Sequence, residues 1–243
     1  MTGQLTPSRA DQQRALWLST LSFTLCFAVW TIFSIIGLSI KDQLNLSEFE
    51  YGLLIATPVL SGSLTRLILG VWTERYGGRL VFSAQMFLTG LATFALTWAN
   101  SYLTFLVAAL GVGLAGGSFI IGVAYVTKWY PQERQGTALG FFGMGNVGAA
   151  VTKFFAPFVL VAWGWQGVAE VWAAAIALMG VAFYILAKDD PNFAARREVG
   201  IEAPSLAEQF APLKSLQVWR FSLYYFFVFG GFVALALWLP HYL

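Results

Sequence analysis

Seven long apolar segments constrain this chain more than any other feature of its sequence. A helix of about 20 apolar residues crosses a hydrocarbon core about 30 Å thick, and in lipid the backbone polar groups of such a segment must be paired inside the protein. Composition agrees, because 58% of the residues are hydrophobic and only 11% are charged. The sequence therefore predicts an all-α integral membrane protein in contact with the lipid bilayer. The expected spans are roughly residues 15 to 40, 50 to 72, 80 to 99, 102 to 127, 136 to 161, 166 to 187 and 217 to 240.

Basic residues are strongly biased to one side of these spans. If the N-terminus is cytoplasmic, that side holds eleven of the fourteen lysines and arginines, and the other side holds Lys41 alone. This bias predicts a cytoplasmic N-terminus, and we expect a multi-pass protein of the cell inner membrane. The net charge of +2 is too small to indicate nucleic acid as a partner. The eleven basic residues are Arg9, Arg14, Arg75, Arg79, Lys128, Arg134, Lys188, Arg196, Arg197, Lys214 and Arg220.

The sixth connection differs from the others. Residues 188–216 are charged and contain Pro191, Pro204 and Pro212, which is typical of a linker between two bundles. We therefore expect a six-helix transmembrane bundle over residues 1–187 and a seventh transmembrane helix over residues 217–243. Because the chain ends as this helix leaves the membrane, we expect a truncated protein whose C-terminal half is missing. The alternative is a complete seven-helix protein.

The loop between the second and third spans reads GVWTERYGGR from Gly70 to Arg79. Its glycines permit a tight turn, and Glu74 is expected to form an ion pair with Arg75 or Arg79 at the membrane surface. The loop resembles the signature loop of the Major Facilitator Superfamily, with glutamate in place of the more usual aspartate. The resemblance implies a six-helix N-terminal half of that fold plus the first helix of the second half. It also implies a gating and packing role, where the alternative is a basic anchor loop, for Gly70, Glu74, Arg75, Gly77 and Arg79.

Arg66 is a charged residue inside the otherwise apolar segment from Tyr51 to Val71. It precedes Arg75 by nine residues, so its guanidinium is expected about 13 Å deep in a core about 30 Å thick. A charge at that depth is costly and usually faces a bundle interior or a water-filled cavity. We therefore expect an anion pathway with Arg66 as its ligand, in a transporter and not in an enzyme.

The fifth span carries a cluster of small residues around an asparagine. Gly143, Gly145 and Gly148 let helix backbones approach closely, and Asn146 must find a hydrogen-bond partner or a ligand. Asn146 is expected about 15 Å deep, level with Arg66, so both side chains are predicted to coordinate one anion in a central cavity. The alternatives are packing alone for the glycines and an interhelical hydrogen bond for Asn146.

The stretch from Thr127 to Pro157 closely resembles the nitrate/nitrite porter family within the same superfamily. The fifth helix of that family contains the pattern glycine, any residue, glycine, asparagine, any residue, glycine, found here from Gly143 to Gly148. The family also has an arginine in its second helix, which Arg66 matches. The resemblance extends over nearly the whole chain. It implies secondary active transport of nitrate and nitrite by alternating access, in which arginine holds a planar oxyanion between aromatic rings.

The resemblance also implies roles for individual residues. Arg66 is the anion ligand of the first half, since its planar fork suits two oxygens of nitrate or nitrite. Asn146 contacts the same ion, and the three glycines let the fifth helix bend or slide. Tyr225 and Phe229 correspond to a hydroxyl donor and one aromatic wall, and Phe119 to the other wall. For any single ring, a core or lipid-facing position is the alternative.

Lys153 has two open interpretations. It shares a helix face with Asn146 and lies about 10 Å farther toward the outer surface. Its charge either attracts anions to the mouth of the pathway or extends to the interface and anchors the helix.

The coupling mechanism and the exact substrate stay open. None of the twelve acidic residues falls at the centre of a span, so no proton relay on a buried carboxylate is visible, and both nitrate/proton symport and nitrate/nitrite exchange remain candidates. A single Cys26 and a single His241 indicate no disulfide, no metal site and no cofactor. Two other functions remain, a porter for another small monovalent anion and a membrane sensor that does not transport.

Overall fold

A computed structural model describes residues 7–191, 193–194, 196, 200 and 204–242, with the backbone alone for residues 240–242. Arg197 and the side chain of His241 therefore lie outside the described residues. Within these ranges all regular elements are helices. This confirms the predicted all-α class.

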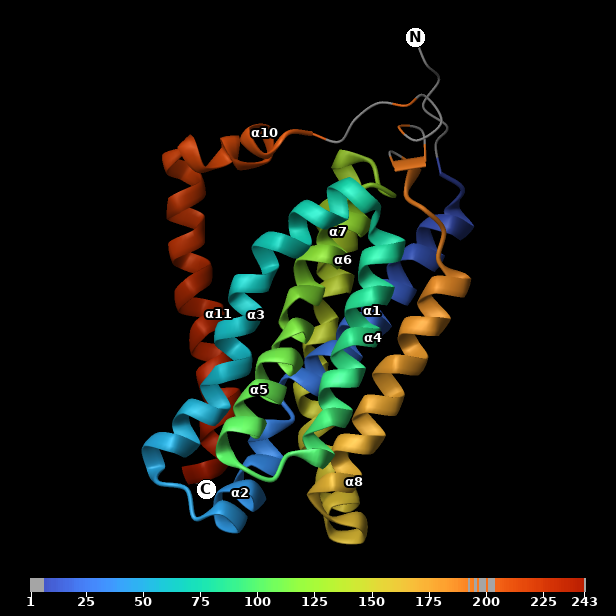
Figure 1. Cartoon of the computed structure of the whole chain (residues 1–243). Coiled ribbons are helices and arrows are strands. Elements are labelled where there is room, and N and C mark those ends of the chain that lie inside the picture. The colour runs from blue at the N-terminus through green and yellow to red at the C-terminus, as the bar shows by residue number, and fades with distance from the viewer. Residues whose placement is uncertain (1–6, 192, 195, 197–199, 201–203, 243) are drawn as a thin grey trace.

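The helices follow the predicted spans closely. In chain order they are α1 (Arg9–Trp30), α2 (Phe33–Leu44), α3 (Glu48–Tyr76), α4 (Gly78–Ala95), the 3₁₀ turn η1 (Leu96–Trp98), α5 (Tyr102–Val112), the 3₁₀ turn η2 (Gly113–Gly117), α6 (Ser118–Thr127), α7 (Gln132–Gly143), the 3₁₀ turn η3 (Met144–Val147), α8 (Gly148–Leu186), α10 (Leu206–Phe210), the 3₁₀ turn η4 (Ala211–Lys214) and α11 (Leu216–Tyr242). The first span is α1 with α2, and the fourth is α5, η2 and α6. The helices stand side by side in one bundle, and α10 lies at the end of the bundle where α11 begins (Figure 1).

Six helical stretches are long and apolar enough to cross a membrane, and one of them, Gln132–Leu186, has 55 residues. At 1.5 Å per residue, 55 residues would extend about 80 Å, more than twice the thickness of a hydrocarbon core. The chain reverses within this stretch at Gly164, whose φ of 71° is not helical. Figure 1 shows α8 turning back at the end of the bundle opposite the N-terminus. The fifth and sixth predicted spans are therefore both present in this stretch.

Local sequence explains where α3 begins and ends. Ser47 accepts a hydrogen bond from the Glu50 amide, and the Glu50 carboxylate accepts one from the Ser47 amide, which completes a capping box. At the other end Gly77 joins α3 to α4 with a φ of 85°, a conformation that glycine adopts without strain. The predicted tight turn is therefore present.

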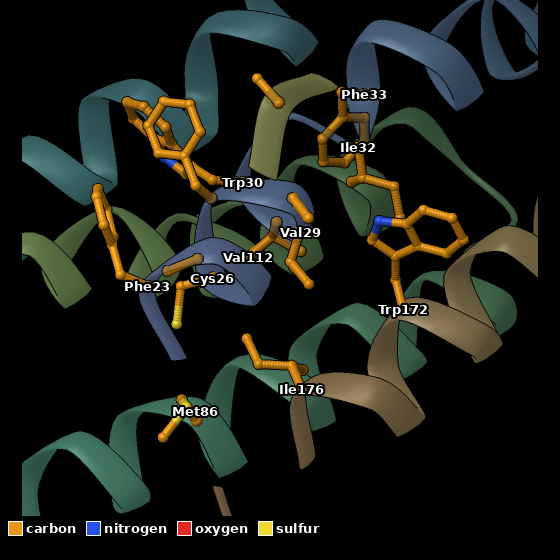
Figure 2. Packing of buried hydrophobic residues seen from close by; sticks show 14 of the residues in the cluster. Phe23, Cys26, Val29, Trp30, Ile32, Phe33, Met86, Val112, Trp172 and Ile176 are labelled. Carbon is orange, nitrogen blue, oxygen red and sulfur yellow. The ribbon is translucent and has the colours of Figure 1, made fainter. Parts of the chain in front are cut away.

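The first span lies at the centre of the bundle and the last at its edge. Of the 18 most apolar consecutive residues in each span, 72% are buried in the first span but only 17% in α11. Phe23, Cys26 and Trp30 of α1 belong to one buried cluster, which Met86 and Ile176 enter from α4 and α8 (Figure 2). A polar contact lies inside it, from the Cys26 thiol to Oε1 of Gln85 at 3.7 Å. The central α1 therefore supplies a surface against which α6, η3 and α8 pack.

Candidate functional site

Arg66 lies in α3, ten residues before the helix ends at Tyr76. Its Nε donates a hydrogen bond to the carbonyl oxygen of Gly116 in η2 at 2.9 Å. Its Cζ lies 5.8 Å from the ring centroid of Trp30 in α1 and 5.7 Å from that of Phe229 in α11. The guanidinium is thus partly buried and held among three other elements of the bundle.

No carboxylate neutralises this cation in the part of the chain that the structure describes. The ion pairs found there involve other lysines and arginines. Nε makes the one hydrogen bond that Arg66 forms with the described residues. The two terminal nitrogens have no hydrogen-bond acceptor among these residues. A guanidinium in this state can donate two parallel hydrogen bonds to an oxyanion.

The aromatic residues expected at the site do lie together. Tyr225 stacks on Phe229 with ring centroids 5.0 Å apart and an interplanar angle of 12°. Phe119 of α6 stacks on Tyr225 at 6.3 Å and also contacts Phe23 at 5.5 Å. Phe229 therefore faces the guanidinium directly, while Phe119 extends the aromatic wall behind Tyr225.

Trp30 is a site residue that sequence reasoning missed. It is 3% exposed, its ring faces the Arg66 guanidinium, and its indole nitrogen donates a hydrogen bond to the carbonyl oxygen of Pro58 at 2.9 Å. A tryptophan in the middle of an apolar span gives no distinctive signal, because any core position accepts one.

Asn146 lies in η3 and is hydrogen-bonded within its own turn of helix. Its Nδ2 donates to the carbonyl oxygen of Gly143 at 2.8 Å, and its Oδ1 is buried without a hydrogen-bond partner among the described residues. The residue lines a cavity of about 470 Å³ that η3 and α8 form with α11, and Arg66 does not line it. Phe232 links the two places, since it lines this cavity and its ring lies 6.2 Å from that of Phe229. Asn146 and the Arg66 guanidinium therefore do not line one cavity, and the Gly143 carbonyl group takes one of the two N–H donors of the Asn146 amide.

Lys153 lines the same cavity as Asn146. It takes part in none of the ion pairs among the described residues. The shared helix face predicted for the two residues is therefore present, and it brings a cation and an amide to one cavity wall.

The three glycines of the fifth span differ in what surrounds them. A Cβ on Gly145 would collide with the ring of Phe23, and one on Gly148 would lie 2.8 Å from the backbone nitrogen of Ala28. Both contacts bring η3 and α8 directly against α1. At Gly143 a Cβ would meet no atom within 4 Å. Close packing therefore requires glycine at 145 and 148, while 143 leaves open space.

The predicted ion pair between Glu74 and Arg75 or Arg79 is wrong. Glu74 instead pairs with Lys128, at 2.8 Å, and with Arg196, at 3.9 Å. Arg79 pairs with Asp189 at 4.0 Å, and Arg75 lies over the ring of Tyr76 at 5.6 Å. The reason is tertiary, because Lys128, directly after α6, and Arg196, in the segment after α8, bring their charges to the α3–α4 turn.

The segment after α8 closes over this turn. A Cβ on Gly77 would lie 2.9 Å from the ring of Phe193, and a Cβ on Gly70 would make only ordinary contact with Ile120 at 3.5 Å. Asp190 is fully buried, accepts a hydrogen bond from the Phe193 amide at 2.9 Å and lies 3.9 Å from Nζ of Lys128. Burial raises the pKa of the Asp190 carboxyl, and the nearby Lys128 charge opposes that rise. We call Glu74, Lys128, Asp190 and Arg196 the turn charge cluster.

Comparisons with known proteins agree with this arrangement. The sequence model of the Major Facilitator Superfamily matches residues 18–243. The chain is 42% identical over 251 residues to a probable nitrate/nitrite antiporter, NarK1, of Thermus thermophilus, covering 98% of this chain and 55% of that protein. It is 33% identical to a nitrite extrusion protein of Bacillus subtilis, covering 96% and 57%. It thus spans about half the length of the curated relatives it matches.

The fold is also found in solved structures. A bacterial homologue of the human lysosomal transporter Spinster, in an inward-facing and occupied conformation, has a TM-score of 0.68 at 20% identity. This match covers 76% of the chain and 46% of that protein. The unoccupied form of the homologue gives the same TM-score at 21% identity, covering 79% and 50%. The chain belongs to the Major Facilitator Superfamily and is a multi-pass membrane protein.

Proposed function

We propose that this chain forms the first half of a nitrate/nitrite porter that works by alternating access across the cell inner membrane. The observation that carries the proposal is the Arg66 guanidinium, which no carboxylate neutralises among the described residues and whose two terminal nitrogens are free to bind an oxyanion. A planar ion with two acceptor oxygens fits that fork. The names of the relatives support nitrate and nitrite as the ions.

Other residues have supporting roles in this proposal. Phe229 and Phe119 provide aromatic surface, and Tyr225 provides a hydroxyl donor beside the cation. Gly145 and Gly148 allow η3 and α8 to move closely along α1, while Lys153 draws anions into the cavity that Asn146 lines. The bias of basic residues supports a cytoplasmic N-terminus, which places the turn charge cluster on the cytoplasmic side. There Gly70, Glu74, Arg75, Gly77 and Arg79 act in gating.

An unpaired cation at the Arg66 site favours exchange of one anion for another. An empty positive site is costly to carry through the membrane interior, and a bound anion removes most of that cost, so reorientation is favoured in the loaded state. A proton relay for symport that uses a buried carboxylate requires an acidic residue, and this half has none at the centre of its spans. That group would have to come from the C-terminal half that the proposal includes.

Binding to the chain and flux through the complete gene product test the proposal separately. The purified chain in nanodiscs is titrated with nitrate, nitrite, acetate and lactate, and its thermal unfolding midpoint is followed. We expect nitrate and nitrite to raise the midpoint, whereas stabilisation by acetate or lactate would indicate a different porter. The gene product that contains this chain is then placed in proteoliposomes loaded with nitrite. Nitrate uptake that needs internal nitrite indicates exchange, uptake that needs an inward proton gradient indicates symport, and binding without flux would indicate a sensor.

A further inference from the structure

Trp30 makes three separate contacts that all bear on the geometry of Arg66. We infer that Trp30 is a positioning residue, which holds the guanidinium in the orientation that leaves its two terminal nitrogens free for an anion. The consequence for transport rests on the proposed function. The contacts themselves are independent of it.

The first contact fixes the tryptophan to the helix that carries Arg66. The indole N–H donates to the Pro58 carbonyl oxygen at 2.9 Å. Pro58 lies in α3 eight residues before Arg66, which is about 12 Å along the helix axis. This hydrogen bond joins the end of α1 to α3 at Pro58.

The second contact sets the position of the carbonyl group that receives Arg66. A Cβ on Gly62 or on Gly116 would lie 3.0 Å from the indole nitrogen of Trp30, so both backbones already touch the edge of the ring. The Gly116 carbonyl oxygen accepts the hydrogen bond from Arg66 Nε. Movement of the indole would therefore move η2 relative to α3 and change the direction of the guanidinium.

The third contact is the ring face itself. The guanidinium Cζ lies 5.8 Å from the centroid of Trp30, a distance at which an aromatic face stabilises a cation. A carboxylate in that position would neutralise Arg66 and compete with the anion, whereas a ring stabilises the charge without competing. Phe229 makes a similar contact from α11, but Trp30 belongs to the same six-helix unit as Arg66. We therefore expect the Trp30 contact to persist when the two halves move.

A matched pair of substitutions tests this role. Trp30→Phe removes the N–H donor and reduces the ring face, and Trp172→Phe makes the same chemical change at a buried tryptophan that donates to Thr152 at 2.9 Å, outside the contacts of Arg66. Figure 2 shows Trp30 and Trp172 on different sides of the buried cluster. Both variants are purified in nanodiscs, checked by size-exclusion chromatography and titrated with nitrate. Trp30→Tyr, whose six-membered ring carries a hydroxyl group, replaces Trp30→Phe if that protein does not elute as a single folded species.

The expected result is a selective loss of anion affinity. We expect Trp30→Phe to raise the nitrate concentration for half-maximal stabilisation about fivefold, as loss of one buried hydrogen bond and part of a cation–π contact implies. In the complete gene product, KM should rise by a similar factor while the maximal rate changes less than about twofold. Trp172→Phe should lower the unfolding midpoint without nitrate and leave the nitrate affinity unchanged.

Two results would overturn the inference, and a third concerns the proposed function instead. Equal nitrate affinity in Trp30→Phe and the parent chain would show that the tryptophan does not position Arg66. Equal loss in both variants would show a general packing effect. If the parent chain does not respond to nitrate or nitrite at all, the proposed function fails, and the orientation of Arg66 is then compared by titration with chlorate and formate.

Discussion

Arg66 and Lys128 are both largely enclosed cations, and the molecule treats them in opposite ways. Lys128, with 11% of its side chain exposed, lies 2.8 Å from Glu74 and 3.9 Å from Asp190. Arg66 has two aromatic faces and one backbone carbonyl group around it, and none of the ion pairs among the described residues includes it. A cation matched by protein carboxylates fixes one arrangement of the helices. A cation without a carboxylate partner in the protein can instead bind a mobile anion reversibly.

The largest expected effect on nitrate uptake comes from a substitution that changes the geometry of the Arg66 cation but keeps its charge. In Arg66→Lys an ammonium replaces the planar fork and cannot make two parallel hydrogen bonds to one oxyanion. Nitrate uptake by the complete gene product should fall to less than about 1% of the parent rate, with protein levels maintained. Lys128→Arg, a change of the same kind in reverse, should retain most of the uptake. Normal uptake by Arg66→Lys would remove the distinction between the two cations.

Removing the matched cation should affect stability more than binding. Lys128→Met leaves the buried Asp190 without its nearest positive charge, and an uncompensated buried charge is costly. We expect a loss of about 2 kcal/mol in the free energy of unfolding, less than for a fully buried pair because Glu74 is partly exposed. Nitrate affinity of the folded fraction should change less than about twofold. A large loss of affinity with unchanged stability would contradict the assigned role of the turn charge cluster.

Asn146→Ala tests whether the cavity beside the Arg66 site belongs to the anion pathway. The amide lines that cavity but is hydrogen-bonded to Gly143, so we expect a moderate loss of nitrate affinity, about fivefold, with the fold intact. Gly140→Ala is the control, since a Cβ there meets no atom within 4 Å. If Asn146→Ala loses expression and keeps affinity, the residue serves packing alone.

The turn charge cluster should also respond to pH. Burial raises the pKa of Asp190 above its ordinary value of 3.8, so the folded protein holds this proton more tightly than the unfolded chain. The stabilising contribution of the carboxyl group is then full below 3.8 and is lost as pH rises through the raised folded value. Unfolding midpoints of the parent and of Asp190→Asn, measured from pH 4 upward, should therefore shift progressively in favour of the variant. A difference between the two that is independent of pH would mean that Asp190 titrates equally in both states.

The smallest effect is expected at Lys153, a second cation that takes part in none of the ion pairs among the described residues. Lys153 contributes to the field at the cavity, so Lys153→Gln should lower the nitrate association rate about twofold at low salt, with no effect at high ionic strength. Lys41→Gln is the control, because Lys41 is already paired with Glu48 at 2.5 Å. A reduction that persists at high salt would indicate direct contact between Lys153 and the ion.

The sequence predicted more of the fold than of the site. Runs of apolar residues and the capping residues Ser47 and Gly77 set the helices and their ends, because hydrophobic length and cap chemistry are local properties. Arg66 was recognisable since a charge in an apolar span needs a reason. Trp30 was not, because a tryptophan among apolar residues becomes informative only when its neighbours in other helices are known.

What the chain alone determined is an all-α membrane protein of the Major Facilitator type with an unusual arginine in its second span. Only the tertiary structure decided that Glu74 pairs with Lys128 and Arg196, that Trp30 faces Arg66, and that Asn146 lines a neighbouring cavity. The physical reason is that burial in a membrane depends on the composition of each segment. The choice of a partner depends on which side chains from distant segments packing brings within a few ångströms.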